Sequence, residues 1–400
     1  MSPLNFQDVF TQLNQLLIEF QAVWRAKPFI QDTLAWHNQY PQLHNALLAL
    51  TDEQLQSLED ETRLLDWMSV YLPQLGFISP LQIPRFEGEL SDMAKFADVG
   101  IGGRKKQQIV GFASVVKNFG ADGGHILDWC SGKGHLAKHL HYVTGQQVTC
   151  LEYDKALCDA GAKEAAKLNY DIRFIEQDVL QPINSTLVES ANLNTALHAC
   201  GTLHITMLKT ATKARSSYIA LSPCCYHLIK HDHYEALSQR AKQSALLLSK
   251  DDLRLAVLQT VTAGNRVKRL REQELIWRIG FDLLQRQLTG VEQYHAMASF
   301  NKQCLSGSFD DFCRFMAKQL RLELPKSIDT DVLLDKARLK HQKILRLEKV
   351  RLAFRKAMEY WLLLDRVLFL QEQGYEVDML RFCDEKTSPR NTLILGRQLS

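Results

Sequence analysis

One stretch of the sequence combines an apolar strand, an acidic residue and a glycine-containing turn that leads into a helix. It runs Ile-Leu-Asp-Trp-Cys-Ser-Gly-Lys-Gly-His-Leu over residues 126–136. Glycine at alternate positions of the turn allows positive φ angles and lets the backbone approach a nucleotide closely. The stretch therefore predicts a cofactor site. The residues expected to line it are Asp128, Cys130, Ser131, Gly132 and Gly134.

The spacing of this motif indicates which cofactor it binds. The order is D-x-C-x-G-x-G, without the third glycine of the G-x-G-x-x-G pattern that a dinucleotide requires. This favours S-adenosylmethionine. Glu152 ends the next apolar run about 20 residues after Gly132, where a carboxylate can accept hydrogen bonds from both ribose hydroxyls. Asp178 follows a third run and could accept from the adenine amino group. The alternative for the glycine turn alone is a tight structural turn.

Short β-type runs alternate with helical segments after residue 105, which predicts a parallel sheet with helices on both faces. We expect an α/β, Rossmann-like three-layer sandwich with a helical N-terminal region and a helical insertion before the last two strands. The predicted strands cover 126–128, 148–152, 172–175, 195–198, 218–221, 377–380 and 392–395. Their carboxyl ends would form the ligand-binding edge.

The remaining sequence is predicted to be largely helical. Residues 1–98 have apolar side chains at helical spacing, and Thr51-Asp-Glu-Gln54 is a capping box that predicts a helix from there to about Tyr71. The expected break is marked by Pro73, Pro80 and Pro84. We expect three regions: an N-terminal helical region 1–98, a cofactor domain 99–227 and 340–400, and a helical insertion 228–339.

Composition excludes several classes of protein. The chain has 400 residues, 46% hydrophobic and 23% charged, which is typical of globular domains rather than disordered or fibrous ones. No apolar run is long enough for a membrane span, and the start lacks a signal-peptide pattern, so a cytoplasmic protein is expected. Nine cysteines without a C-x-x-C pair predict no disulfides. Residues 1–98 carry 13 acidic and 5 basic side chains, a net charge of about −8. The rest of the chain therefore has a net charge of about +11.

The chain resembles class I S-adenosylmethionine-dependent methyltransferases, in particular the group that includes the methyltransferase region of the glutathione S-transferase C-terminal-domain-containing protein. The shared features are Lys105-Lys106, the D-x-C-S-G-K-G-H-L stretch, Cys224-Cys-Tyr226 and Ser388-Pro-Arg-Asn391. Relatives follow the Lys pair with His-Glu, whereas this chain has Gln107-Gln108. The resemblance implies S-adenosylmethionine as cofactor, Lys105 at its site, the usual strand order with an antiparallel last strand, and one sheet-covering helix over 340–373.

The resemblance places the acceptor near two further segments. His198 and Cys200 lie at the end of the fourth strand, where many methyltransferases contact the acceptor, and Cys200 is assigned to the cofactor side. Cys224, Cys225 and Tyr226 follow the fifth strand and are the acceptor-facing candidates, with His198. The alternatives are a proline-fixed turn with buried thiols, or a thiolate nucleophile for cytosine C5 methylation. No Asn/Asp-Pro-Pro-Tyr occurs, so adenine amino-group methylation is not supported.

Histidines near the cysteine pair raise the question of a metal site. Cys224, Cys225, His227, His231 and His233 would be its ligands, but the vicinal cysteines lack the gap of an ordinary zinc knuckle, so no metal site is expected. A second histidine pair, at positions 135 and 139, is explained more simply as solvated or capping.

The acceptor is predicted from charge. Residues 336–356 carry nine basic side chains and one acid, which predicts a basic amphipathic helix able to bind an RNA backbone together with Arg266, Lys268, Arg269 and Arg271. The simplest alternative is a solvated helix face. A protein acceptor, such as a translation component, and a non-catalytic cofactor-binding scaffold are the other hypotheses. No membrane partner is expected.

Overall fold

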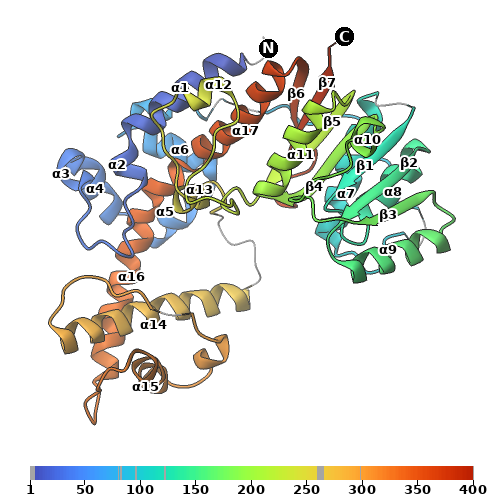
Figure 1. The fold of residues 1–400 in the computed structure, drawn as a ribbon. Coiled ribbons are helices and arrows are strands. Elements are labelled where there is room, and N and C mark those ends of the chain that lie inside the picture. The colour runs from blue at the N-terminus through green and yellow to red at the C-terminus, as the bar shows by residue number, and fades with distance from the viewer. Residues whose placement is uncertain are drawn as a thin grey trace. The chain divides into compact units, whose positions relative to one another are not determined.

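The computed structural model of this chain describes residues 5–79, 81, 83–94, 97–120, 123–258, 265–297 and 299–399. The chain divides into two compact units. Unit 1 comprises residues 1–18, 80–258 and 355–400, and unit 2 comprises residues 19–79 and 259–354. Each unit therefore combines segments that are far apart in the sequence (Figure 1).

Unit 1 is built around a seven-stranded sheet in the order β3-β2-β1-β4-β5-β7-β6. The strands are β1 (His125–Trp129), β2 (Gln147–Glu152), β3 (Ile172–Glu176), β4 (Leu193–Cys200), β5 (Tyr218–Cys224), β6 (Tyr375–Arg381) and β7 (Thr392–Gln398). Strand β7 is antiparallel to both of its neighbours, and the other pairs are parallel. All seven predicted strands, their order and the antiparallel last strand are confirmed.

Helices cover both faces of this sheet. The helices of unit 1 are α1 (Phe6–Glu19), α7 (Gly103–Asn118), α8 (His135–Thr144), α9 (Lys155–Lys167), α10 (Ser185–Glu189), α11 (Thr202–Lys213), α12 (Gln239–Lys242), α13 (Lys250–Leu255) and α17 (Arg355–Glu372). Helices α12 and α13 pack against α17. The sheet order runs from β1 toward β3 on one side and toward β5 on the other, so right-handed crossovers place α8 and α11 on opposite faces. The expected three-layer α/β architecture is confirmed (Figure 1).

The core of one sheet face is formed mainly by α7 and α8. Phe112 and Val115 of α7 pack with Leu140 of α8 and with apolar side chains of β1, β2, β4 and β7. Gly111 lies where α7 passes over the end of β6, and a Cβ there would lie 2.1 Å from the carbonyl oxygen of Phe382. Glycine is therefore required for the close approach of α7 to this strand.

The segment after β5 is held to α17 by a buried polar network. Asp365, which is fully buried, accepts hydrogen bonds from the Tyr234 hydroxyl, the Leu237 amide and the amide and hydroxyl of Ser238. Its neighbour Arg366 is also buried and bonds the Tyr234 hydroxyl. Because buried charges require such partners, this network fixes residues 234–238 on the cofactor domain.

Unit 2 is entirely helical in its described residues. Its elements are α2 (Gln21–Trp24), α3 (Trp36–Gln39), α4 (Pro41–Leu48), α5 (Asp52–Ser57), α6 (Glu61–Ser69), η1 (Pro73–Leu75), α14 (Asn265–Thr289), η2 (Lys302–Leu305), α15 (Phe309–Leu320) and α16 (Thr330–Ala353). Trp277, Phe281 and Phe312 form the centre of one apolar cluster between α14, α15 and α16. The N-terminal helices α2, α4 and α6 pack against α16.

Several cations of α16 are structural. Lys340 pairs with Asp32 at 2.7 Å, and Arg346 pairs with Asp52 at 2.8 Å and bonds the Leu50 carbonyl. Lys349 is buried and donates to the Leu58 carbonyl at 3.0 Å. The acidic N-terminal segment and the basic helix thus neutralise each other within one unit, which has 21 basic and 19 acidic side chains in total.

The observed units differ from the three expected regions. Residues 1–18 and 228–258 belong with the cofactor domain, because the Asp365 network holds the latter to α17. Residues 340–354 belong instead with the helices of unit 2. The boundaries expected after residues 98, 227 and 339 therefore do not match the packing.

Two predicted helices are interrupted. The capping box at Thr51 is confirmed, but its helix is short, and α6 begins after a new N-cap at Asp60. The helix expected over 340–373 is wrong as a single element, since Phe354 separates α16 from α17. Pro80 of the expected proline break lies outside the described residues. In the described part of the chain, no helix has the length and apolar character needed to cross a bilayer.

We predict that Gly111→Ala destabilises the protein by about 2 kcal/mol or more, because the added methyl group must displace the backbone at Phe382. Gly103→Ala is the matched control, since Gly103 begins the same helix and a Cβ there meets nothing within 4 Å. Urea unfolding of both variants and the parent measures the difference. Equal midpoints for the two variants would show that the α7 contact is not as tight as described.

Candidate functional site

The loop after β1 adopts the backbone conformation that its glycines predict. Cys130, Gly132 and Gly134 have φ values of 56°, 58° and 65°. A Cβ at Gly132 would meet open space, so this glycine leaves room for a ligand. A Cβ at Gly134 would lie 2.6 Å from the Phe174 ring, so Gly134 serves helix-to-sheet packing instead. Cys130 holds the left-handed conformation without being glycine, which costs about 1 kcal/mol.

The carboxylate of Glu152 ties this loop to the second strand. Its Oε2 accepts a hydrogen bond from the Gly132 amide at 2.8 Å, and its Oε1 accepts from the Asp154 amide at 3.0 Å. A carboxylate has about four acceptor positions, so both oxygens can still accept from hydroxyl groups. Glu152 therefore organises the loop and remains able to bind a ribose.

Asp128 is a buried carboxyl group with an unsatisfied oxygen. It is 2% exposed, and its Oδ2 has no hydrogen-bond partner among the described residues. Burial, together with the negative charge of Glu152, raises the pKa of Asp128 to about 8. Ser131 beside it has a buried hydroxyl that also lacks a described partner. Unsatisfied polar atoms of this kind mark a place where a ligand completes the hydrogen bonding.

The other predicted cofactor residues gather around the same strand ends. Asp178 is half-buried, and its Oδ1 accepts from the Leu180 amide at 2.9 Å. Burial raises the pKa of the Cys130 thiol to about 12, with further contributions from the charges of Glu152, Asp128, Cys200 and Asp178. Because β3, β2, β1 and β4 are neighbouring parallel strands, the residues at their carboxyl ends lie at one edge of the sheet.

A β-bulge shapes the end of β4. Leu197 is paired with Ser222 of β5, but Cys200 is paired with Cys224, so β4 contains one extra residue between the two pairs. His198 lies within this bulge at φ 71°, and its side chain is exposed. Surrounding protein atoms lower the pKa of His198, as does the positive charge of Lys105. Lys105 itself lies in the first turn of α7.

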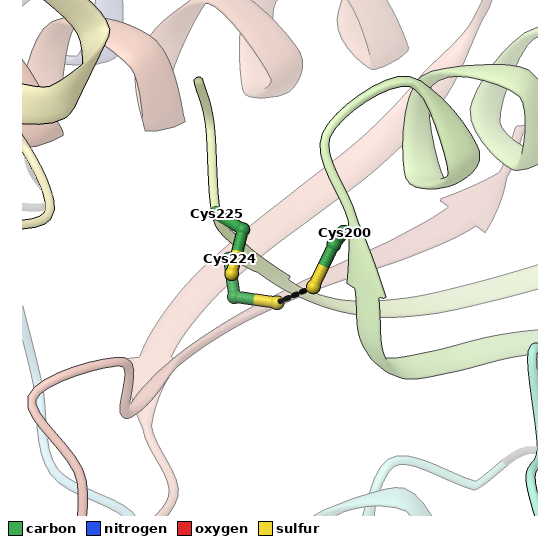
Figure 2. A group of neighbouring side chains, drawn as sticks. All are labelled: Cys200, Cys224 and Cys225. Carbon is green, nitrogen blue, oxygen red and sulfur yellow. Dashed lines mark hydrogen bonds between the residues drawn. The ribbon is translucent and has the colours of Figure 1, made fainter. Parts of the chain in front are cut away.

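Three cysteine thiols meet beside this bulge. The Sγ atoms of Cys200, Cys224 and Cys225 all lie within 4.8 Å of one another, and those of Cys200 and Cys224 are 3.3 Å apart (Figure 2). Hydrogen bonds from Cys224 and Cys225 lower the pKa of Cys200 to about 6. The hydrogen bond with Cys200 raises the pKa of Cys224, and burial raises the pKa of Cys225. The cluster therefore favours ionisation of the Cys200 thiol over that of the Cys224 and Cys225 thiols.

Other predicted residues are not part of this cluster. Tyr226 is 1% exposed, and the Arg366 guanidinium lies 5.0 Å from its ring centroid, so it faces the buried interior rather than an acceptor. The His227, His231 and His233 side chains are not among the grouped ligand atoms. The second histidine pair, expected to be solvated or capping, is buried in α8 instead.

A cavity beside α7 was not predicted. It has a volume of about 820 Å³ and lies between the first turns of α7, residues 85–92 and residues 382–387. Phe86, Lys106 and Gln107 are among its lining residues. Its three segments are distant in sequence, so no local pattern could identify it. The resemblance at Lys105-Lys106 was the one signal that pointed to this helix turn.

Comparisons with known proteins identify the segment that carries this site. Residues 104–232 match a family described as a methyltransferase domain. This segment is a class I methyltransferase domain. Its methyl donor is S-adenosylmethionine. The segment covers about a third of the chain, and the assignment confirms the resemblance and the predicted cofactor.

Similar proteins match part of the chain. The glutathione S-transferase C-terminal domain-containing protein of Xenopus laevis is 32% identical over 130 residues, which are 32% of this chain and 20% of the relative. The mouse protein of that name is 29% identical over 169 residues, 42% of this chain and 23% of the relative. The chain thus spans about a fifth of the length of these curated relatives.

Among solved structures, a Pyrococcus abyssi tRNA (uracil-54, C5)-methyltransferase in complex with S-adenosyl-L-homocysteine is 20% identical. The match covers 29% of this chain and 28% of that one, with a TM-score of 0.25. The assignment of residues 104–232 to a methyltransferase domain does not depend on this structural match.

The residues of the domain fit S-adenosylmethionine. The cofactor carries positive charge on its sulfonium and ammonium groups, and the site supplies the carboxyl groups of Asp128, Glu152 and Asp178. The unsatisfied Asp128 and Ser131 oxygens offer hydrogen-bond acceptors, and the open space at Gly132 removes a steric barrier. Both features are expected of a preformed cofactor site.

Asp128 gives the cofactor-free protein a specific pH dependence. Its pKa is about 8 in the folded protein and about 3.9 in an unfolded chain. The folded state therefore binds more protons between these values, and the free energy of unfolding falls as pH rises from about 4 to 8.

We predict that Asp128→Asn, which cannot ionise, removes this decrease. Urea unfolding without cofactor at pH 5 and pH 7 tests it, and the parent should lose up to about 1.4 kcal/mol per pH unit relative to the variant. Parallel pH profiles for the two proteins would contradict the assigned protonation of Asp128.

Proposed function

We propose that the protein transfers a methyl group from S-adenosylmethionine to RNA. The methyl donor, when bound, supplies an electrophilic methyl carbon on a sulfonium centre. The chain's own residues position the reactants, since Asp128, Glu152 and Asp178 hold the donor at the carboxyl ends of β1, β2 and β3. Alignment of donor and acceptor is the main contribution that such a reaction needs from the protein.

His198 is the proposed proton acceptor. Its lowered pKa keeps the imidazole neutral at pH 7, and its side chain is exposed at the end of β4. An acceptor hydroxyl or ring nitrogen that loses its proton during methyl transfer could donate it to this imidazole. Lys105 opposes protonation of His198 through its positive charge. The pair therefore favours a base at this position.

The observation that carries the RNA proposal is a group of exposed cations at the start of α14. They are Arg266, Lys268, Arg269 and Arg271, and none forms an ion pair with a residue that the structure describes. Positive charge near a helix N-terminus is unfavourable for the helix dipole. A polyanionic partner would offset this repulsion and release counterions from its phosphates.

Fewer cations of the basic helix are available to an RNA than its sequence suggests. Lys340, Arg346 and Lys349 of the basic helix bind groups of unit 2, so they are not available to phosphates. Lys336 and Lys343 remain exposed on α16. The proposed surface consists of these two lysines and the four cations of α14, two helices that pack against each other.

The first experiment is transfer of labelled methyl groups into extract from cells that lack this protein, followed by digestion with ribonuclease or protease. Ribonuclease-sensitive label is expected. Glu152→Ala is the control, and its labelling should fall by about tenfold or more because the ribose loses charge-assisted hydrogen bonds.

The other outcomes contradict the proposal in distinct ways. Protease-sensitive label would establish a protein acceptor instead of RNA. Equal labelling by the Glu152→Ala variant and the parent would remove the assigned cofactor role of Glu152. Cofactor binding without any transfer to the extract would favour the scaffold hypothesis.

Charge reversal tests the RNA surface directly. We predict that Lys268→Glu combined with Arg271→Glu weakens binding of a generic RNA and lowers the slope of log affinity against log salt by about 1 to 2. Lys163→Glu with Lys167→Glu is the matched control, because both lysines are exposed on α9. Filter binding between low and moderate salt provides the measurement. Equal losses in both double variants would show a nonspecific charge effect and exclude this surface.

A further inference from the structure

The three thiols beside the β4 bulge form a site that the methyl-transfer proposal does not explain. Cys200 ends β4, Cys224 ends β5, and Cys225 follows it, and their Sγ atoms lie within 4.8 Å of one another. Figure 2 shows the Cys200 and Cys224 thiols pointing toward each other from neighbouring strands. This arrangement brings together three soft ligand atoms at the strand edge that also holds the cofactor site.

The backbone is shaped specifically to bring these thiols together. If β4 and β5 continued in the register of Leu197 and Ser222, Ala199 would be opposite Cys224, but the bulge places Cys200 there instead. Bulges near functional sites commonly redirect a side chain in this way. The bulge requires His198 to hold φ 71°, a conformation that a non-glycine residue rarely adopts.

A second turn positions the third thiol. Cys225 has φ 45°. The Cys224 carbonyl accepts a hydrogen bond from the Gly201 amide, and the Cys225 carbonyl accepts one from the Leu228 amide. Gly201 is needed here, since a Cβ would lie 1.9 Å from the Leu228 carbonyl oxygen. Three uncommon conformations, at His198, Gly201 and Cys225, thus surround one group of thiols. Strained residues of this kind concentrate at functional sites.

We propose that Cys200, Cys224 and Cys225 bind one Zn²⁺ ion. Thiolates are preferred ligands of this cation, and Zn–S bonds of about 2.3 Å in a tetrahedron place sulfur atoms about 3.8 Å apart, close to the spacing of this cluster. Three protein ligands leave the fourth position open for water or an acceptor atom, as in catalytic rather than structural zinc sites. Binding releases the thiol protons to solvent.

The ligand set explains why sequence spacing did not predict the site. Cys224 and Cys225 are vicinal, and the third ligand comes from a different strand 24 residues earlier. The nearby histidines at 227, 231 and 233, which the sequence offers as ligands, are not needed. The proposal is independent of the acceptor, because metal content can be measured without any methyl transfer.

The test is the zinc content of the full-length protein, purified under reducing conditions without added chelator. We expect one zinc per chain in the parent and a decrease of roughly tenfold or more in Cys225→Ser. Cys383→Ser is the matched control, because Cys383 is also half-buried and free but lies outside the cluster, and its zinc content should match that of the parent.

Replacement with Co²⁺ provides a second readout that does not depend on activity. The parent and Cys383→Ser should show intense thiolate-to-cobalt charge-transfer absorption, and Cys225→Ser should lose part of it. Thermal melting and circular dichroism of Cys225→Ser establish that the variant is folded. If that variant does not fold, Cys200→Ser replaces it in the same comparison.

Two results would overturn the proposal. The first is a parent protein that contains no zinc and gives no cobalt–thiolate absorption after reconstitution. The second is a Cys200–Cys224 disulfide, found by peptide mapping in protein isolated without reductant, together with zinc content equal in parent and Cys225→Ser. That second result would identify the cluster as a redox pair. Neither result would affect the methyl-transfer proposal, which the labelled-methyl experiment tests separately.

Discussion

The carboxylate of Glu152 is the contact on which the cofactor site depends. It accepts hydrogen bonds from the Gly132 and Asp154 amides, so one side chain fixes the loop after β1 against the end of β2. Without this contact, the open space at Gly132 and the buried carboxyl of Asp128 would not be held in one arrangement. The negative charge of Glu152 also contributes to the raised pKa of Asp128, which links the geometry of the site to its protonation.

Charge has a different role in each unit. In unit 1, a buried carboxyl oxygen of Asp128 has no partner among the described residues and lies at a site for a positively charged cofactor. In unit 2, opposite charges are matched internally, as in the pairs of Lys340 with Asp32 and Arg346 with Asp52. The charge separation along the chain therefore largely disappears on folding. The exposed cations at the start of α14, with Lys336 and Lys343 of α16, form the surface proposed for RNA.

The acceptor side of the site depends on one extra residue in β4. The bulge at His198 exposes an imidazole of lowered pKa and also places Cys200 beside Cys224. The proposed proton acceptor and a group of thiols thus arise from the same irregularity in the sheet. Backbone strain of this kind concentrates at functional sites.

The sequence alone determined the sheet, the cofactor loop and the carboxylates at the strand ends, because these depend on local patterns of apolar residues, glycines and acids. Asp128, Gly132 and Glu152 were predicted in this way. Only the tertiary structure decided which distant segments share a unit, that Tyr226 is buried, and that Cys200 meets the Cys224-Cys225 pair. These features depend on strand register and on packing between segments far apart in the chain, which local spacing does not encode.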